Sequence, residues 1–411
     1  MSTTAGEFRW RPILVPAYGP TALASLGYGA LAPIVALAAI DLGAGVATAA
    51  LVVGLTAFGQ LIGDLPAGVI AARLGERRAL LLASLVDAAS MTVAYFAHSL
   101  LVLAIAVFVD GMAAAVFNLA RHTWMTTAIP VRYRARALSS LGGTFRIGLF
   151  FGPFIAAGLV SAFSLHAVFL FAAGTGLAAG LLTLTMAELP MPEPRPGELS
   201  ATDPVTLARV VRRHLRVLAT IGVGVLLISA ARASRQSILP LWSQAQQLDA
   251  STISLIFGIA SGVELLLVYP GGAVMDRYGR VFVAVPAVAL MGVGLGLLPL
   301  AHTAVSICLV ACVMAVGNGL SSGIVLTLGS DAAPAVGRPQ FLGAWRFLAD
   351  TGGILGPGLI AVVAAIGTLA GAAWVLVGVC ALGAGWLAAW APRRSPVIPV
   401  SVRSTRPPQH P

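Results

Sequence analysis

Long apolar runs, separated by short polar segments, follow one another along almost the whole chain. A membrane-spanning α-helix needs about 20 apolar residues to cross a hydrocarbon core of roughly 30 Å, and about twelve runs reach that length. Because every backbone polar group inside a bilayer needs a partner, these runs predict transmembrane helices. They lie at 13–40, 46–71, 79–97, 100–128, 137–163, 166–188, 215–240, 250–275, 281–301, 304–330, 341–365 and 368–391.

A constant offset of 204 residues (272 − 68) relates the two halves of the chain. Ten further pairs in this register indicate a duplicated fold, whereas one glycine pair would mean little among 46 glycines. The pairs are Gly54 with Gly258, Pro66 with Pro270, Arg73 with Arg277, Gly75 with Gly279, His98 with His302, Pro130 with Pro334, Arg134 with Arg338, Gly148 with Gly352, Gly152 with Gly356, and Pro153 with Pro357. We expect pseudo-symmetric six-helix bundles at 1–188 and 215–391, a Pro-rich cytoplasmic linker at 189–214, and a disordered cytoplasmic tail at 392–411.

The composition supports a membrane protein. Hydrophobic residues make up 58% of the chain and charged residues 10%, with a mean hydropathy of +0.93, which indicates an all-α integral membrane protein. The three cysteines stand in apolar surroundings, which argues against a disulfide framework or a metal site. The sequence shows no phosphate-binding loop or nucleophile motif, so we expect neither an enzyme nor a bound cofactor. The apolar run from Ile13 is too long for the core of a cleavable signal peptide.

The basic residues indicate the orientation in the membrane. All 25 are arginines, and they gather in every second loop and at both ends. The other loops hold Asp41, His98, His166, Asp249 and His302 instead. This positive-inside pattern predicts cytoplasmic termini in a cell inner (plasma) membrane, and it accounts for the net charge of +10 without a nucleic-acid partner.

A short charged turn between two apolar runs contains Gly272, Asp276, Arg277, Gly279 and Arg280. A weaker copy contains Gly68, Arg73, Gly75, Arg77 and Arg78, with Ala72 in place of the aspartate and Glu76 in place of an arginine. These residues resemble the Gly-x-x-x-Asp-Arg-x-Gly-Arg-Arg signature of the major facilitator superfamily of secondary transporters. The pattern Gly148-x-x-x-Gly152-Pro153, echoed by Gly352-x-x-x-Gly356-Pro357, resembles a motif of the drug:proton antiporters in that superfamily.

The resemblance implies a fold in which the first, fourth, seventh and tenth spans line a central cavity. It also implies that the charged turns form a conformational latch, to which Asp64 would belong. We expect Asp276 to face the start of the helix at 137–163, and Arg280 to reach Asp331. The alternative is that the turns act only as topology signals. The Gly-x-x-x-Gly-Pro patterns predict close helix approach and bending, with simple packing as the alternative.

Ionisable residues inside spans are costly and are usually paired or functional. The implied contact of the fifth and eighth spans predicts an ion pair between Arg146 and Glu264 near the middle of the membrane. By the repeat offset, Asp350 and Gln60 would form a polar contact on the opposite side. The alternative for Asp350 is a pair with Arg346, four residues away on the same helix.

Asp110 and Arg121 are eleven residues apart and therefore share one helix face, with Asn118 and Trp124 near it. If that face lines the cavity, Asp110 is a candidate for carrying protons, and Arg121 could tune it or hold an anionic substrate group. The alternative is that Asp110 shares a proton with Asp87 or pairs with an arginine.

The remaining candidates are less specific. Arg232, Arg235 and Gln236 lie toward the outer part of their helix, where they would line a vestibule or reach the interface. The first span has no acid inside it, and Tyr18, Ser25 and Tyr28 offer an aromatic, hydroxylated surface for a neutral or amphipathic ligand. The full set of cavity candidates is Tyr28, Asn118, Arg121, Trp124, Arg235, Gln236 and Asn318; the proton-coupling candidates are Asp87, Asp110, Glu264 and Asp350.

Together these features predict a monomeric secondary transporter that exports amphipathic small molecules in exchange for protons. An importer, symporter or uniporter of a sugar, organic acid or other metabolite is the alternative within transport. A non-transporting membrane sensor is the alternative outside it.

Overall fold

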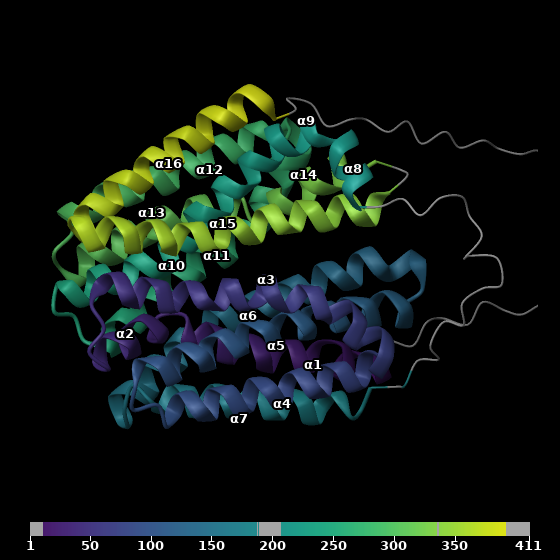
Figure 1. The fold of residues 1–411 in the computed structure, drawn as a ribbon, viewed down its shortest axis with the longest axis horizontal. Coiled ribbons are helices and arrows are strands. Elements are labelled where there is room, and N and C mark those ends of the chain that lie inside the picture. The colour runs from purple at the N-terminus through teal and green to yellow at the C-terminus, as the bar shows by residue number, and fades with distance from the viewer. Residues whose placement is uncertain (1–10, 187, 189–206, 335–336, 392–411) are drawn as a thin grey trace, which may run out of the picture.

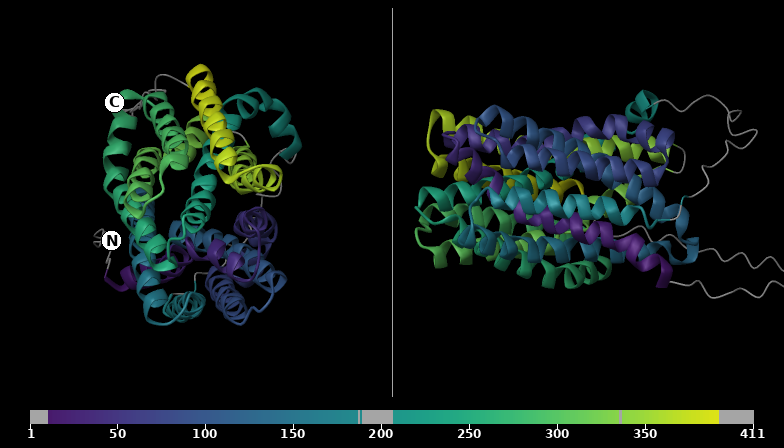
Figure 2. Two further views of the ribbon diagram at one scale, coloured as in Figure 1. Left: turned by 90° about the vertical axis from the view of Figure 1, so that its left-hand side faces the viewer. Right: turned by 90° about the horizontal axis from the view of Figure 1, so that it is seen from below.

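The computed structural model describes residues 11–186, 188, 207–334 and 337–391, and these residues form helices and turns without strands. Figure 1 shows two helical bundles lying side by side, one from each half of the chain, with their helices roughly parallel to the long axis. We call the end at which α1 begins and α16 ends the terminal face, and the opposite end, where α2 lies, the far face. Figure 2 shows the same two halves in an end-on view and in a view from below.

In the part of the N-terminal bundle that the structure describes there are seven helices. α1 and α2 form one span that bends by 44° near Pro33, because proline cannot donate the hydrogen bond that would continue the helix. The seven are α1 (Arg11–Leu31), α2 (Ile34–Asp41), α3 (Val46–Leu74), α4 (Glu76–Tyr95), α5 (Leu100–Ala128), α6 (Val131–Ala162) and α7 (Ala167–Thr183).

The C-terminal bundle repeats this arrangement with small irregularities. A π-helical turn (Leu218–Gly222) precedes α10, and Ser321, Ser322 and Gly323 interrupt the span made of α13 and α14. The helices are α8 (Leu207–Arg213), α9 (Leu215–Val217), α10 (Val223–Ala245), α11 (Ala250–Tyr278), α12 (Val281–Leu297), α13 (Ala304–Leu320), α14 (Ile324–Ala332), α15 (Arg338–Ile366) and α16 (Leu369–Trp390), with a 3-10 turn at Leu298–Leu300.

The apolar helices match the predicted spans. Among the described residues, 10 helices are long and apolar enough to cross a membrane, and the bent pair α1–α2 raises this to 11. The twelfth predicted span corresponds to α7, an apolar helix of 17 residues. The fold is therefore the predicted all-α membrane fold of two six-helix bundles. The short helix α8 lies within the segment predicted as linker and packs against α15, whereas residues 189–206 and the predicted tail lie outside the described residues.

The 204-residue repeat holds at the level of helix ends. Both ends of α11 are those of α3 shifted by 204 residues (250 − 46 and 278 − 74). Each of these helices ends at a glycine, Gly75 or Gly279, with a positive φ of 78° or 103°. A residue without a side chain is needed there, because a Cβ disfavours this backbone conformation.

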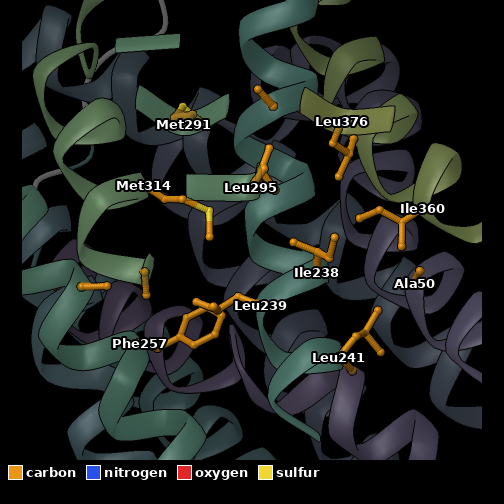
Figure 3. Close-up of a cluster of buried hydrophobic side chains, with 14 of the residues drawn as sticks. Ala50, Ile238, Leu239, Leu241, Phe257, Met291, Leu295, Met314, Ile360 and Leu376 are labelled. Carbon is orange, nitrogen blue, oxygen red and sulfur yellow. The ribbon is translucent and has the colours of Figure 1, made fainter. Parts of the chain in front are cut away.

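Apolar packing joins the two bundles toward the far face. One buried cluster includes residues from the far half of the N-terminal bundle and from the whole length of the C-terminal bundle, and Figure 3 shows part of it, with Ala50 of α3 and Ile360 of α15. α2 also packs against α10 and α11. A separate cluster, which includes Ala67, Leu80 and Trp124, fills the terminal half of the N-terminal bundle alone. Among the described residues, the buried apolar cluster that joins the two bundles therefore reaches the N-terminal bundle only in its far half.

Candidate functional site

A cavity of about 450 Å³ lies between the two bundles. Its lining residues come from α1, α2, α3, α4 and α5 of the N-terminal bundle and from α10 and α15 of the C-terminal bundle. Its polar walls come from both bundles: Tyr28, Thr56, Gln60, Asp110, Ser229, Arg232, Gln236 and Asp350. We call this space the central cavity. It is within the size range of small-molecule binding sites.

A second space of about 320 Å³ extends from the central cavity into the N-terminal bundle. We call it the side chamber. The two spaces share Tyr28, Leu31, Gln60, Asp110 and Gln236, so they adjoin at these residues. The polar residues found only in the side chamber are Ser84, Asp87, Asn118, Arg121 and Thr175.

Asp87 of α4 and Asp110 of α5 lie against each other, with their carboxyl groups close enough to interact through a side-chain hydrogen bond. Two carboxyl groups form such a bond only when one of them holds a proton. Gly176 of α7 leaves the space that Asp87 occupies, because a Cβ there would lie 2.1 Å from Asp87 Oδ2. The structure therefore places Asp87 and Asp110 side by side, as the alternative interpretation of Asp110 required, and the shared proton stays a prediction.

The other half of the chain shows that the fold does not require this acid pair. The 204-residue offset places Met291 and Met314 at the positions of Asp87 and Asp110. Both methionines are fully buried in the apolar cluster of the C-terminal bundle, as Figure 3 shows. Because the same helices pack well around thioethers, the two acids add polarity that packing alone does not need.

Arg121 is buried at the wall of the side chamber, with 9% of its surface exposed. Its two terminal nitrogens donate to Thr21 Oγ1 at 3.0 Å and to Asn118 Oδ1 at 3.1 Å. Its Cζ lies 5.7 Å from the centre of the Phe117 ring. The predicted cavity face with Asn118 and Arg121 is thus present, but Trp124 is buried in the apolar cluster of the terminal half and does not line either space.

Glu264 of α11 forms a buried ion pair with Arg235 of α10, within the C-terminal bundle. The sequence analysis paired Glu264 with Arg146 of α6; Arg146 interacts with it electrostatically, but Arg235 is its ion-pair partner. The difference arises because α11 lies between α6 and α10, and a helical sequence does not show which neighbour a side chain meets. Arg235 consequently lines neither space.

Arg232 lies in the wall of the central cavity. Its Nη2 donates to the backbone carbonyl of Ser321 and, at 2.9 Å, to Ser321 Oγ. In the interruption between α13 and α14, that carbonyl also accepts from the backbone amide of Ile324 at 3.0 Å. Arg232 and Arg235 lie near the middle of their span, which corrects the prediction that they lie toward its outer part, because the span continues past Pro240 to Ala245.

A cluster of two acids and one arginine joins the bundles on the terminal side of the central cavity. Arg346 of α15 lies 3.1 Å from Asp64 of α3 and 3.5 Å from Asp350 of its own helix, each measured from Nε to Oδ2. Asp64 and Asp350 also interact with each other. The pair between Arg346 and Asp350 that sequence spacing suggested is present, and Asp64 extends it across the bundle interface.

The charged turn at 272–280 contains the predicted contact between Arg280 and Asp331, with Nε 3.0 Å from Oδ2. Arg280 also lies 3.2 Å from Asp276. Asp276 itself is 76% exposed, and its predicted contact with the start of α6 stays a prediction. The latch function of this turn stays a prediction.

The turn at 68–78 lacks this ion pair. At the positions equivalent to Arg280 and Asp331 it has Glu76 and Thr127 (280 − 204 and 331 − 204). Instead, Arg77 donates to the carbonyl of Leu184 at 2.7 Å. Arg73 is exposed, as is Arg277 in the other copy.

The two Gly-x-x-x-Gly-Pro patterns bring helices into backbone contact. A Cβ on Gly152 of α6 would lie 2.6 Å from backbone atoms of Leu26 and Ala30 in α1. Gly356 of α15 meets Ala230 and Ser234 of α10 in the same way, and Gly148 and Gly352 make the corresponding contacts one turn earlier. The predicted close approach is present in both halves, while α6 and α15 remain continuous past Pro153 and Pro357.

Of the other residues predicted to lie in the cavity, some line it and others lie outside its walls. Tyr28 and Gln236 line both spaces. Tyr18 and Ser25 do not, because Tyr18 bonds to the carbonyl of Ala137 and Ser25 is fully buried against α6. Asn318 is half-buried outside both linings.

Some residues of the site were not found from the sequence. Ser84, in the side chamber, has a buried hydroxyl without a hydrogen-bond partner, and its alignment with Asp87 along α4 could have indicated it. Thr21 lies 100 positions from Arg121, and no sequence pattern joins the two. In the described part of the chain, no group of His, Cys, Asp and Glu side chains could hold a metal ion.

Both a protein-family model and a curated transporter match the chain. The family model described as "Major Facilitator Superfamily" matches residues 21–357 and 221–410. The chain is 25% identical over 307 residues to the MFS-type transporter YhjO of Bacillus subtilis (strain 168), covering 74% of this chain and 72% of that protein.

Solved structures share the fold at low sequence identity. A POT family transporter in complex with a thioalcohol-conjugated peptide has a TM-score of 0.75 and 13% identity, covering 92% of this chain and 95% of that one. The nucleoside transporter NupG has a TM-score of 0.71 and 15% identity, covering 91% and 98%. A D-xylose–proton symporter has a TM-score of 0.68 and 15% identity, covering 92% and 98%.

Proposed function

Because the chain belongs to the major facilitator superfamily of membrane transporters, we propose that it is a proton-coupled antiporter that exports amphipathic small molecules. The proton gradient is the energy source, no bound cofactor takes part, and the working unit is a monomer. The central cavity holds the substrate, and the bundles rock about it to expose it to one side of the membrane and then the other. The contact between the carboxyl groups of Asp87 and Asp110, in the wall of the side chamber, is the observation on which the proposal rests.

The acid pair supplies a proton carrier at the right place. Asp110 lines both the central cavity and the side chamber, so a substrate and a proton meet at the same carboxyl group. A buried carboxyl is neutral when protonated and costly when charged, and its proton affinity therefore changes as water reaches the cavity from one side or the other. Loading on one side and release on the other couples proton entry to substrate exit.

The arginine distribution supports the orientation. Arg73, Arg77, Arg277 and Arg280 all lie in turns at the terminal face, where the positive-inside rule places the cytoplasm. The protein is then a multi-pass protein of the cell inner (plasma) membrane with cytoplasmic termini. Because apolar packing joins the bundles toward the far face, we infer that this state loads substrate from the cytoplasm.

Export is favoured over import by the Gly-x-x-x-Gly-Pro pattern of α6, whose resemblance is to drug:proton antiporters. Import by proton symport is the second candidate, and the shared fold with a D-xylose–proton symporter makes it worth testing. Both candidates use the acid pair, and they differ in the direction in which protons and substrate move relative to each other.

The test uses inside-out vesicles with a pH-sensitive dye inside, acidified by respiration. We would compare wild type with Asp87→Asn and Asp110→Asn, and add lipophilic cations, organic anions, neutral antibiotics and sugars in turn. Asp41→Asn is the matched control, because Asp41 is exposed at the end of α2 and away from both spaces.

We expect at least one amphipathic compound to release protons from wild-type and Asp41→Asn vesicles and to release none from the two cavity variants. Proton release that persists in both cavity variants would remove the acid pair from the mechanism. A compound that moves across the membrane without protons would replace the antiporter with a uniporter.

A further inference from the structure

Arg121 is the most isolated buried charge that faces the side chamber. Its side chain reaches Thr21 and Asn118 with two of its nitrogens, and both partners are neutral. The third nitrogen, Nε, is buried without a hydrogen-bond partner. A guanidinium has five N–H donors, so most of the donor capacity of Arg121 is unused.

Two other arginines near the cavities have acidic partners: Arg235 is paired with Glu264, and Arg346 is paired with Asp64. Arg232, in the wall of the central cavity, resembles Arg121, because it donates to neutral Ser321 and its Nε is also buried without a hydrogen-bond partner. Among the described residues, no carboxylate is within ion-pair distance of Arg121. Asp110, on the same helix, is eleven residues away, which is about 16 Å along the axis. A positive charge in this position lacks the compensation that buried charges in membranes usually have.

The fold does not need an arginine at this position. By the repeat offset, the residue equivalent to Arg121 is Val325, a half-buried apolar residue of α14. The charge is therefore an addition of the N-terminal bundle, in the same half of the chain as the acid pair. Arg121 and the acid pair of Asp87 and Asp110 all line the side chamber.

The walls beside Arg121 are apolar and aromatic. Phe117 lies under the guanidinium, and Phe145, Leu149 and Ala83 line the same space. Together with the central cavity they surround an apolar body, while Arg121 supplies unused donors at one end. This combination fits a ligand that has an apolar part and one negative group.

We propose that the side chamber binds an amphipathic organic anion, whose carboxylate or phosphate accepts hydrogen bonds from Arg121. The proposal rests on the function proposed above and names the class of its substrate. Charge-assisted hydrogen bonds are stronger than neutral ones, and planar guanidinium groups suit both anions. The bound anion supplies the counter-charge that the protein itself does not provide.

The experiment measures equilibrium binding to the purified full-length protein in a neutral detergent, by isothermal titration calorimetry. The probes share one aromatic body and differ in charge: 2-naphthoate, 2-naphthyl phosphate, 2-naphthylmethylammonium and 2-naphthol. The variants are Arg121→Gln and Arg121→Lys. Arg212→Gln is the matched control, because Arg212 is an exposed residue of α8 outside both spaces.

We expect one or both anionic probes to bind wild type and Arg212→Gln, with little binding of the cation or the alcohol. Arg121→Gln should weaken that binding by about tenfold or more, and Arg121→Lys by less, because the charge remains while the planar donor set is lost. The stronger of the two anions shows whether the group recognised is a carboxylate or a phosphate. If Arg121→Gln does not fold, the comparison of Arg121→Lys with Arg212→Gln decides.

Equal anion binding by wild type and the Arg121 variants would overturn the proposal. Preference of wild type for the cation or the alcohol, or failure of both anions to bind, would overturn it as well. The measurement needs no proton gradient, so its outcome is separate from the vesicle test. Anion binding at Arg121 without proton movement in vesicles would contradict the antiporter and leave the anion site in place.

Discussion

Asp64 of α3 and Arg346 of α15 form an ion pair across the interface between the two bundles, with Oδ2 and Nε 3.1 Å apart. Arg346 also has Asp350 beside it on its own helix, so loss of Asp64 does not leave the arginine without an acid. The cross-bundle contact can therefore be removed alone.

We predict that Asp64→Asn shifts the equilibrium away from the state described here by two- to fivefold. A partly exposed ion pair contributes about 0.5–1 kcal/mol, which corresponds to a shift of that size. Spin labels at Ala72 and Tyr278, one on each bundle at the terminal face, would report the populations by their distance distribution in a cysteine-free background.

Glu188→Gln is the control for this variant, since the ion pair between Glu188 and Arg78 lies within one bundle. It should leave the distance distribution unchanged. A distribution that is the same in Asp64→Asn and wild type would mean that this ion pair does not influence the conformational equilibrium.

Substitutions at Gly68 and Gly272 would test whether the two bundles close together at the terminal face during the transport cycle. A Cβ on either glycine meets no atom within 4 Å in this state, although both positions belong to the charged turns. We predict that Gly68→Leu and Gly272→Leu leave thermal unfolding unchanged but reduce transport by about tenfold or more, because the side chain obstructs a helix that arrives on closure.

Gly158→Leu is the matched control, because this glycine of α6 also faces open space but lies toward the far face. Transport in vesicles and thermal unfolding of the purified variants would be measured together. Full activity of both turn variants would argue that no helix packs on these glycines in any state.

The helix positions followed from the sequence because hydrophobic length and caps are local properties. The offset of 204 residues even predicted that α11 would match α3. The contact of Arg280 with Asp331 followed from the family signature. These features depend on spacing along the chain, which a sequence states directly.

The side-chain partners in the cavity did not follow in the same way. Glu264 could meet Arg146 or Arg235, since α6 and α10 both pack near α11, and only the rotation of each helix decides between them. The helix break at Ser321 also changes the local backbone hydrogen bonding, and Arg232 donates to the carbonyl and the hydroxyl of that residue. Such choices depend on three-dimensional packing that periodicity leaves open.

Gly152 and Gly356 give a prediction on stability. Each brings two helix backbones so close that a Cβ would lie within 2.6 Å of the opposite backbone. We predict that Gly152→Ala and Gly356→Ala each destabilise the protein by about 1–3 kcal/mol, because the helices must move apart. Gly358→Ala, where a Cβ meets no atom within 4 Å, should change stability little. Chemical unfolding in detergent measures all three.

Asp249 gives a prediction on pH dependence outside the membrane-spanning helices. It caps the N-terminus of α11: Oδ2 accepts from the Thr252 amide at 2.9 Å, and Oδ1 accepts from Thr252 Oγ1 at 2.7 Å. These hydrogen bonds, the one from the amide first, hold the pKa of the Asp249 carboxyl below its ordinary value. A carboxylate with a lowered pKa in the folded state stabilises that state at neutral pH.

The stabilisation is present above the unfolded pKa of about 3.9 and is lost as the pH falls through the lower folded value. We predict that Asp249→Ala costs about 1 kcal/mol at pH 7, because an N-cap is removed. Asp249→Asn should cost less, since asparagine also caps. The difference between wild type and Asp249→Asn should shrink on acidification below about pH 4, as the native carboxyl takes up its proton. Thermal unfolding in detergent over a pH series measures this, and a difference that grows toward low pH would contradict the assigned role of the carboxylate.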